Sequence, residues 1–346
     1  MAYTDIDKPT DYFETVTYTG NGTGQDITTL DFQPDWLWIK RRDSAGSHRI
    51  QNSITGTTNY LQSNKTNEEQ SGGAVDTFLS NGFSLNTSDA AYNGSGATYV
   101  GWSWLGANGT ASNTDGSITS TVSANTTSGF SIVSYTGSGS AATIGHGLST
   151  SPSMILVKNR STAYSWIVYH KSLGATKNLY LDLANAADTA SIQFNDTEPT
   201  SSVFSVGTSL ATNKSGDNLI AYCFAEKKGF SKFGSYTGNG STNGTFVYTG
   251  FKPAFVMIKE TDNSSTNWMI YDNKREIYNP QIIRLFPNET LGDTSNSGVY
   301  DIDLLSNGFK IRTTNNNFNR SGANHIYMAF AENPFVTSTG IPDCAR

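Results

Sequence analysis

The stretch that decides the fold is YTGNG at residues 18–22, because near copies recur as YTGSG at 135–139 and YTGNG at 236–240. Each copy is followed by a proline-led apolar run that ends in lysine, and these runs read PDWLWIK (34–40), PSMILVK (152–158) and PAFVMIK (253–259). The distance from tyrosine to proline is nearly constant, so the copies stay in register beyond a local motif. An internal repeat fixes the architecture before any single residue is interpreted. We therefore expect one structural unit to occur three times.

Two further blocks recur after the proline-led run. The first is a hairpin, FLSNGFSL (78–85) and LLSNGFKI (304–311), for which Asn-Gly between apolar flanks predicts a type I′ turn. The second repeat departs from it with VFSVGTSL (203–210). The last block closes each unit as NGSGATYVGWSW (93–104), NKSGDNLIAYCF (213–224) and NRSGANHIYMAF (319–330). Its alternating large side chains predict a strand with one apolar face.

Length and composition predict an all-β fold of three tandem, related, antiparallel β-sandwich or jelly-roll-like domains. The 346 residues suit three units of about 100 residues, which can bury cores of their own. Glycine and asparagine favour turns, while aromatic and β-branched residues favour strands. The predicted division is an N-terminal arm (1–13), repeat 1 (14–109), a linker (110–128), repeat 2 (129–228), repeat 3 (229–335) and a C-terminal tail (336–346).

Several residues are of a type that could bind a ligand or catalyse a reaction, but the residues at the same positions in the other repeats indicate a packing role. Trp36, Trp38, Trp102 and Trp104 resemble a sugar-stacking platform, but Met, Leu, Tyr and Phe replace them in the other repeats, so we interpret them as core. The repeated lysines Lys40, Lys158 and Lys259 are expected to cover a sheet edge with their stems and to place the ammonium in solvent or near a carboxylate. Glu226 and Glu332 are the carboxylates that a glycoside hydrolase would need.

No catalytic, cofactor or metal site is expected. The four histidines are widely spaced without a zinc-ligand pattern, and no nucleophile elbow or phosphate-binding loop is present. Oxygen-rich loops at 261–267 and 293–297 lack the fixed ligand spacing of calcium sites. Cys223 and Cys344 do not suggest a disulfide framework. We therefore expect the chain not to be an enzyme.

Ligand recognition is expected in the segments where the three repeats differ in sequence, because loops on a rigid sandwich carry binding functions. The loops that follow the proline-led strand, 41–49, 159–165 and 260–267, are the best candidates. The binding residues predicted in them are Arg41, Arg42, Asp43, His48, Arg49, Asn159, Arg160, Tyr164, Asp262, Asn263 and Asn267.

Charge and hydropathy exclude several partners. A net charge of −6 without a basic run argues against nucleic acid, which needs dense lysine and arginine. No apolar stretch reaches the roughly 18 residues that membrane insertion requires, and the N-terminus lacks the pattern of a signal peptide.

Taken together, MAYTDIDKPTDYFETVTYTGNG, FQPDWLWIKRRD, SNGFSL and YVGWSW resemble a family of marine bacteriophage proteins with a repeated β-rich domain. The resemblance implies a structural virion protein, a tail fibre or fibre-associated module that contacts the host surface. The alternatives are a capsid decoration or head-fibre protein and, less favoured, a polysaccharide depolymerase. The expected location is the virion, assembled in the host cytoplasm. Expected partners are other virion proteins, a host surface glycan or receptor, and further copies of the chain, with a homotrimer favoured by closed symmetry.

Overall fold

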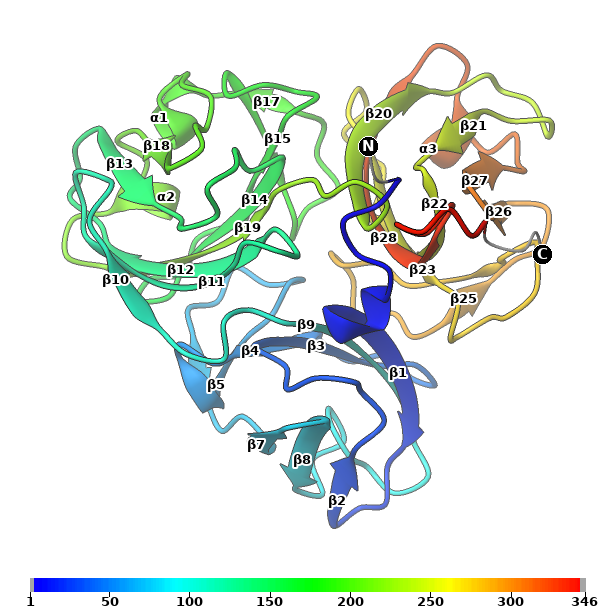
Figure 1. The fold of residues 1–346 in the computed structure, drawn as a ribbon, viewed down its shortest axis with the longest axis horizontal. Coiled ribbons are helices and arrows are strands. Elements are labelled where there is room, and N and C mark those ends of the chain that lie inside the picture. The colour runs from blue at the N-terminus through cyan, green and yellow to red at the C-terminus, as the bar shows by residue number, and fades with distance from the viewer. Residues whose placement is uncertain (1–2, 343–346) are drawn as a thin grey trace.

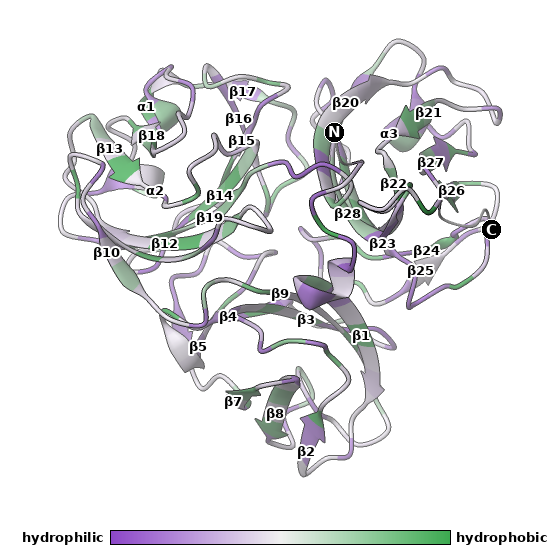
Figure 2. Cartoon of the chain, in the orientation of Figure 1, coloured by the Kyte–Doolittle hydropathy of each residue, from purple (hydrophilic) through white to green (hydrophobic). Residues whose placement is uncertain are grey.

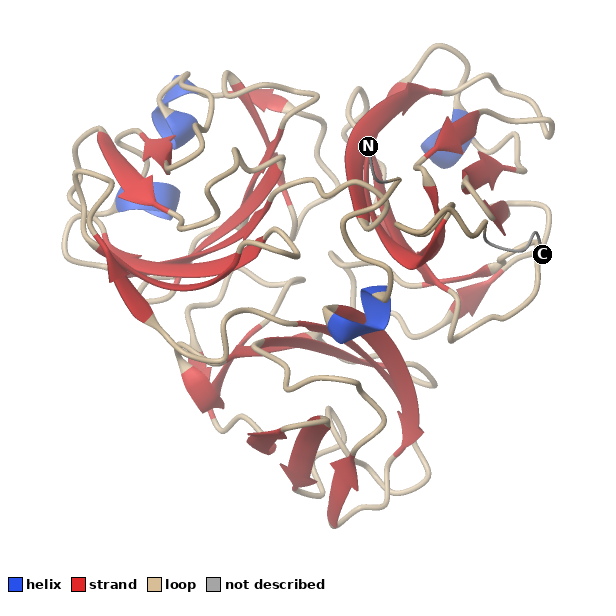
Figure 3. Cartoon of the chain, viewed as in Figure 1, coloured by secondary structure: helices blue, strands red, loops and turns tan. Residues whose placement is uncertain are grey.

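The computed structural model describes residues 3–342, which fold almost entirely into antiparallel β-strands (Figure 3). The strands form three β-sandwich lobes around a common centre, and each lobe turns its large sheet inward and its small sheet outward (Figure 1). The predicted all-β sandwich fold is confirmed. The helices of the described region are single turns, η1 (Pro9–Asp11), α1 (Ser191–Phe194), α2 (Leu210–Asn213) and α3 (Asn316–Asn319). None of them has the length and apolar character needed to cross a bilayer.

The three large sheets share one strand order, which is the structural counterpart of the sequence repeat. The opening strand pairs with the closing strand, the closing strand with the proline-led strand, and the proline-led strand with a fourth. In repeat 1 these strands are β1 (Phe13–Thr19), β9 (Thr98–Trp104), β3 (Trp36–Arg41) and β4 (Arg49–Asn52). Their counterparts are β12 (Phe130–Thr136), β19 (Asn218–Phe224), β14 (Met154–Asn159) and β15 (Ile167–His170), then β20 (Ser231–Thr237), β28 (Asn324–Pro334), β22 (Phe251–Glu260) and β23 (Met269–Asp272).

Other strands extend the large sheets or form the outer layer. The extensions are β5 (Gly56–Leu61) and β6 (Gln70–Ser71) in repeat 1, and β16 (Lys177–Tyr180) and β17 (Asp188–Thr189) in repeat 2. The small sheets comprise β2 (Gly24–Ile27), β8 (Gly82–Asn86) and β7 (Val75–Leu79); β13 (Ala142–Gly145) and β18 (Val203–Val206); and β21 (Phe246–Tyr248), β27 (Gly308–Ile311) and β26 (Ile302–Leu305). In repeat 3, β24 (Ile283–Arg284) and β25 (Thr294–Ser295) form a separate pair.

The segment predicted as a linker, 110–128, is instead part of the second large sheet. It forms β10 (Ala111–Asn113) and β11 (Ser120–Asn125), and β11 pairs with the opening strand β12. Small polar residues do not prevent this pairing, because the ladder uses backbone groups and Val122 is buried against the repeat 2 core.

The predicted hairpins are present as β7–β8 and β26–β27, but their turn differs from the prediction. Leu79 pairs with Gly82, and Leu305 pairs with Gly308, so the turn residues are Ser-Asn rather than Asn-Gly. In the described residues no asparagine of these turns has positive φ. Glycine is required here for a different reason, because a Cβ at either glycine would lie within 3.0 Å of the carbonyl oxygen of the neighbouring small-sheet strand.

All six tryptophans meet, together with several phenylalanines, in one core at the centre of the molecule. The proline-led strands alternate, so that Trp36 and Trp38 face this central core while Leu37 and Ile39 face the small core of repeat 1. Strands β14 and β22 alternate in the same way, and the apolar character of β14 and β19 is visible in Figure 2. The expectation that both faces of these strands are covered, and that the tryptophans are core, is confirmed. The core that they fill lies between the repeats rather than within one.

Aromatic contacts join all three repeats through this central core. The rings of Trp36 and Tyr222 stack with centroids 4.6 Å apart, those of Phe13 and Phe330 stack at 4.9 Å, and those of Phe224 and Phe330 meet edge-on at 6.0 Å. Such offset and edge-on geometries add to the stabilisation from area burial. Each repeat therefore has a small core of its own, and the largest core belongs to all three.

The repeated YTG turn is locked by the N-x-S-G block in the same way in every repeat. The hydroxyls of Tyr18, Tyr135 and Tyr236 donate to the carbonyls of Tyr92, Thr212 and Phe318 at 2.9, 2.7 and 2.9 Å. The buried asparagine that follows each carbonyl, Asn93, Asn213 or Asn319, accepts from the backbone N–H of Asn21, Ser138 or Asn239 at 2.8–2.9 Å. The turn glycines Gly22, Gly139 and Gly240 have φ of 73°, 76° and 67°, which explains their identity.

The N-terminal arm packs on the junction between repeats 2 and 3. Thr4 Oγ1 donates to the carbonyl of Lys228 at 3.1 Å, and Ile6 enters the central core. Asp7 accepts a hydrogen bond from the backbone N–H of Ser338 at 2.6 Å. The first and last described segments are therefore held together.

Candidate functional site

The loops predicted to bind a ligand lie at the three junctions between repeats. We call 41–49, 159–165 and 260–267 the junction loops, and 62–69, 180–187 and 286–293 the receiving loops. At each junction the carbonyl of Arg42, Arg160 or Thr261 accepts from the backbone N–H of Asp293, Glu69 or Ala187, at 2.6, 2.9 and 2.8 Å. Repeat 1 thus contacts repeat 3, repeat 2 contacts repeat 1, and repeat 3 contacts repeat 2. The three contacts form a closed ring.

The three repeated lysines are buried at these junctions and do not reach solvent. Each ammonium donates to a carbonyl near its own strand and to a carbonyl of the receiving loop in the neighbouring repeat. The second set of bonds joins Lys40 to Thr290 at 3.2 Å, Lys158 to Thr66 at 2.9 Å, and Lys259 to Ala184 at 3.4 Å. Burial lowers the pKa of each lysine to about 8. The expectation of an exposed or carboxylate-paired ammonium is wrong, because backbone carbonyls of another repeat supply the acceptors.

A ring nitrogen from the residue before the fourth strand of each large sheet, next to the proline-led strand, adds a further hydrogen bond to each junction. The indole N–H of Trp166 donates to the carbonyl of Gln62, and that of Trp268 to Tyr180, both at 2.8 Å. His48 occupies the corresponding place in repeat 1, where its Nε2 lies 3.0 Å from the carbonyl oxygen of Phe286. The predicted binding residue His48 is therefore buried and already bonded.

Most of the other predicted binding residues also take part in internal contacts. Arg160 forms a bidentate pair with Glu69 at 3.0 and 2.7 Å, and Arg42 pairs with Asp293 at 2.8 Å, in both cases across a junction. Arg49 lies over the ring of Tyr60 at 4.6 Å, and the backbone carbonyl of Tyr164 accepts from Lys158.

The remaining predicted residues bond close to their own loops. Asn159 is buried and donates to Asp217 at 2.9 Å, Asp262 accepts from the N–H of Asn324 at 2.8 Å, and Asn267 accepts from Asn288 at 2.7 Å. Arg41 pairs with Asp43 at 2.7 Å, and Asn263 accepts from the N–H of Ser265 at 3.2 Å. The three loops lie at separate junctions, so the structure does not bring the predicted residues together into one surface. Their role in ligand binding stays a prediction.

The four histidines and Cys223 are buried structural groups. Burial lowers the pKa of His170 and His325 to about 4, and it also lowers the pKa of His48 and His146. Residues 3–342 contain no cluster of three or more His, Cys, Asp or Glu side chains that could hold a metal. Cys223 is a buried free thiol, and Cys344 lies outside the described residues.

The two candidate catalytic carboxylates are held by lysines. Glu332 accepts from Lys252 at 2.9 Å, and Glu226 accepts from Lys171 and Lys232 at 2.5 and 2.6 Å. Burial acts to raise the pKa of Glu226, but the two ammonium groups outweigh it and lower that pKa below its usual value. A carboxylate kept ionised in this way is unsuited to be the general acid of a glycoside hydrolase, which needs a raised pKa.

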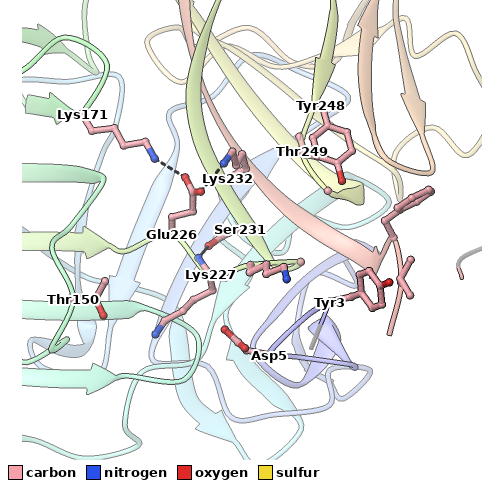
Figure 4. A pocket seen from close by; sticks show the side chains of 15 residues that line it. Tyr3, Asp5, Thr150, Lys171, Glu226, Lys227, Ser231, Lys232, Tyr248 and Thr249 are labelled. Atoms are coloured by element: carbon pink, nitrogen blue, oxygen red, sulfur yellow. Dashed lines mark hydrogen bonds and ion pairs between the residues drawn. The ribbon is translucent and has the colours of Figure 1, made fainter. Parts of the chain in front are cut away.

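A surface depression of about 600 Å³ lies beside Glu226, where repeats 2 and 3 meet the N-terminal arm. Figure 4 shows Lys171 reaching Glu226 from one side and Lys232 from another, with Tyr248 and Tyr3 on the opposite wall. The two tyrosines are 57% and 60% exposed. Sequence reasoning missed this depression because its residues come from six segments that are distant in the sequence. One local signal was available, namely the FVYTG segment at 246–250, where aromatic residues interrupt an otherwise polar stretch.

Residues 8–334 match the protein family described as Domain of unknown function (DUF7483). The match begins in the N-terminal arm, ends with strand β28 and covers all three repeats. The chain therefore belongs to the DUF7483 family. Comparison with curated proteins finds no match to the chain.

Proposed function

We propose that the chain is a structural protein of a bacteriophage virion, a tail fibre or fibre-associated module that contacts the host cell surface. The observation that carries this proposal is the closed ring of junctions, in which polar loops and buried lysines hold three sandwiches as one body. A displayed module must keep its shape outside the cell, and a body whose loops are bonded internally suits that task. The resemblance of its sequence blocks to marine phage proteins supports the same assignment.

A non-enzymatic role fits the chemistry of the described residues. Glu226 is held between two ammonium groups, and the buried histidines are bonded to backbone carbonyls or packed in cores. None of these groups meets the geometry of an acid–base pair facing a cleft. A depolymerase is therefore the least favoured of the three functions.

Oligomerisation would use surfaces other than the large sheets. In a homotrimer of single-sandwich chains, the large sheets of three chains would pack against each other. Here the large sheets of the three repeats of one chain already pack together in the central core. A homotrimer of the whole chain, or attachment to other virion proteins, would have to form through the outer lobes or the flat ends of the body.

The threefold-like arrangement also favours a second candidate function, capsid decoration. A single chain that places three related units around a centre can meet three equivalent neighbours at a symmetry axis of a shell. The junctions and the fold are the same in both proposals, so only the location distinguishes them.

The test is to locate the chain in intact particles by cryo-electron microscopy, with antibody fragments against the chain as markers. Density for the three-lobed body at the tail tip or along tail fibres is the expected result. Regular occupancy of capsid axes would replace the tail assignment with the decoration protein. Absence of the chain from purified particles would contradict both.

A further inference from the structure

Strand β21 in repeat 3 presents an exposed aromatic pair that the other repeats lack. Its burial alternates, with Phe246 44% exposed, Val247 buried and Tyr248 57% exposed. Val247 pairs with Phe309 as Ile27 pairs with Phe83 and as Ile144 pairs with Phe204, which aligns the three strands. In this alignment, Phe246 corresponds to Asp26 in repeat 1 and to Thr143 in repeat 2. Tyr248 corresponds to Thr28 in repeat 1 and to Gly145 in repeat 2. Packing within the sandwich therefore does not require these aromatic side chains.

The charged groups beside Tyr248 are also specific to the junction between repeats 2 and 3. Lys171, Glu226 and Lys232 correspond by register to Ser53, Gly106 and Ser131 at the junction between repeats 1 and 2. There, Asp35 fills the space by accepting from Ser53 Oγ at 2.5 Å and from the N–H of Gly106 at 2.8 Å. The same backbone geometry thus gives a closed polar network at one junction and an open, lysine-lined depression at the other.

The depression carries an excess of positive charge. Four lysines line it, Lys171, Lys227, Lys228 and Lys232, against the two acids Glu226 and Asp5. Glu226 neutralises part of this charge through its bonds to Lys171 and Lys232. The ammonium of Lys227 forms no ion pair within the part of the chain that the structure describes, and Figure 4 shows it beside the depression.

These features match the chemistry of a sugar with acidic substituents. Exposed tyrosine rings offer flat apolar faces to the C–H faces of sugar rings, with a polar hydroxyl at the edge. Sugar hydroxyls both donate and accept hydrogen bonds, which suits ammonium groups alternating with a carboxylate. The excess ammonium charge suits a carboxylate or sulfate group on the ligand. The volume of about 600 Å³ lies within the range of about 300–1,000 Å³ that ligand sites occupy.

We infer that the depression formed by Tyr248, Tyr3 and the Lys171–Glu226–Lys232 bridge is a binding site for acidic carbohydrate. One sugar ring stacks on Tyr248, and an acidic group elsewhere on the same oligosaccharide lies against Lys227 on the other side of the depression. Single-stranded nucleic acid also combines rings with negative charge, but its binding needs a basic groove that follows several phosphates. The net charge of −6 and a single short depression favour carbohydrate.

The test is isothermal titration calorimetry of the purified full chain with four defined probes. They are a neutral maltohexaose, a carboxylated hexagalacturonate, a sulfated galactose hexasaccharide and a single-stranded hexanucleotide. We expect saturable binding of an acidic oligosaccharide, and the two acidic probes show whether carboxylate or sulfate is preferred. Tyr248→Ala and Lys227→Gln should each weaken that binding at least tenfold.

Two substitutions elsewhere serve as matched controls. Tyr278→Ala removes a tyrosine that is 76% exposed in a different loop, and Lys65→Gln removes an exposed lysine of a receiving loop. Both should leave the affinity unchanged, and thermal unfolding should show that all four variants are folded. The inference is overturned by the absence of saturable binding at millimolar concentration, by equal binding of the neutral probe, by tighter binding of the hexanucleotide, or by equal losses in the control variants.

The inference rests on the proposed function for its biological setting, because the acidic carbohydrate would be the surface that the virion contacts. The two can fail separately. Binding by the purified chain does not depend on where the chain lies in a particle, and the location in a particle does not depend on binding.

Discussion

Lys158 illustrates how a charged residue can hold two repeats together. Its ammonium is buried, and it donates to Tyr164 in its own repeat and to Thr66 in repeat 1. Burial opposes the charge, as the pKa of about 8 indicates. Removing the side chain eliminates the free-energy cost of burying its charge, but it leaves the carbonyl oxygens of Tyr164 and Thr66 without this donor. The cost of unsatisfied acceptors is the larger effect when no water can replace the ammonium.

We therefore expect Lys158→Met to lower the free energy of unfolding by about 1–3 kcal/mol. Urea unfolding monitored by tryptophan fluorescence measures this change. The control is Lys65→Met, which removes an exposed lysine next to Thr66 and should have an effect within about 0.5 kcal/mol of zero. Equal stability of Lys158→Met and the parent would show that the junction lysines do not stabilise the body.

The buried histidines predict a loss of stability in mild acid. Burial lowers the pKa of His170 from 6.5 to about 4, so between these values the unfolded chain binds more protons than the folded chain. The stability contribution is thus fully present above pH 6.5 and falls as the pH decreases through this window. Repeat 1 has Asn52 at the same place in its sheet, which shows that an asparagine fits there.

His170→Asn should therefore reduce the loss of unfolding free energy between pH 6.5 and pH 4.5 while leaving the fold intact. The measurement is urea unfolding at several pH values in parallel with the parent chain. Identical pH dependence of the two proteins would mean that His170 is not held neutral in the folded state.

At the scale of elements, the lock between the YTG turn and the N-x-S-G block fixes where the opening and closing strands pair. In repeat 3, the side chain of Asn319 bonds to Asn239, to Ser241 at 2.8 Å and to Thr313 at 2.7 Å. These bonds connect three backbone segments through one side chain, so Asn319 holds the turn in place against the closing block.

Asn319→Ala should lower the free energy of unfolding by about 1–3 kcal/mol, because it leaves the buried carbonyl of Thr313 without a donor and removes two part-buried bonds to Asn239 and Ser241. Asn316→Ala, at an exposed position one helical turn earlier, is the control and should have little effect. Hydrogen exchange of the Asn239 amide gives a local readout, and unchanged protection in the Asn319→Ala chain would contradict the proposed lock.

The sequence was sufficient to predict these elements but not how they assemble. The alignment of the YTG, proline-led and closing blocks predicts the shared strands and the two covered faces of β3, since Trp36 and Leu37 must point in opposite directions. It does not say what covers each face, because alternation is the same whether the partner is a small sheet or another repeat. The loops at 41–49 and 159–165 are polar and variable, which is typical of both an exposed surface and a junction. The residues of the depression meet only in three dimensions.

At the scale of the whole molecule, the central core makes the three repeats one cooperative unit. Phe330 of repeat 3 contacts Phe13 and Trp104 of repeat 1 and Phe224 of repeat 2. If one repeat unfolded, the apolar faces of the other two large sheets would become exposed to water, so partial unfolding is unfavourable.

Differential scanning calorimetry should therefore show one transition with equal calorimetric and van't Hoff enthalpies. Phe330→Ala should lower the stability of this single transition by about 3–5 kcal/mol without splitting it. Three separate transitions, or a variant that melts in two steps, would show that the repeats are independent domains.

The arm that closes the junction between repeats 2 and 3 has a consequence for how the chain is made. Thr4 and Asp7 leave the ribosome well before their partners Lys228 and Ser338, which follow them in the chain by 224 and 331 residues. The same holds for Phe13, which stacks on Phe330. Until strand β28 has been synthesised, Ile6 and Phe13 therefore lack part of the central core that covers them, and the three large sheets can close around that core only after this strand arrives.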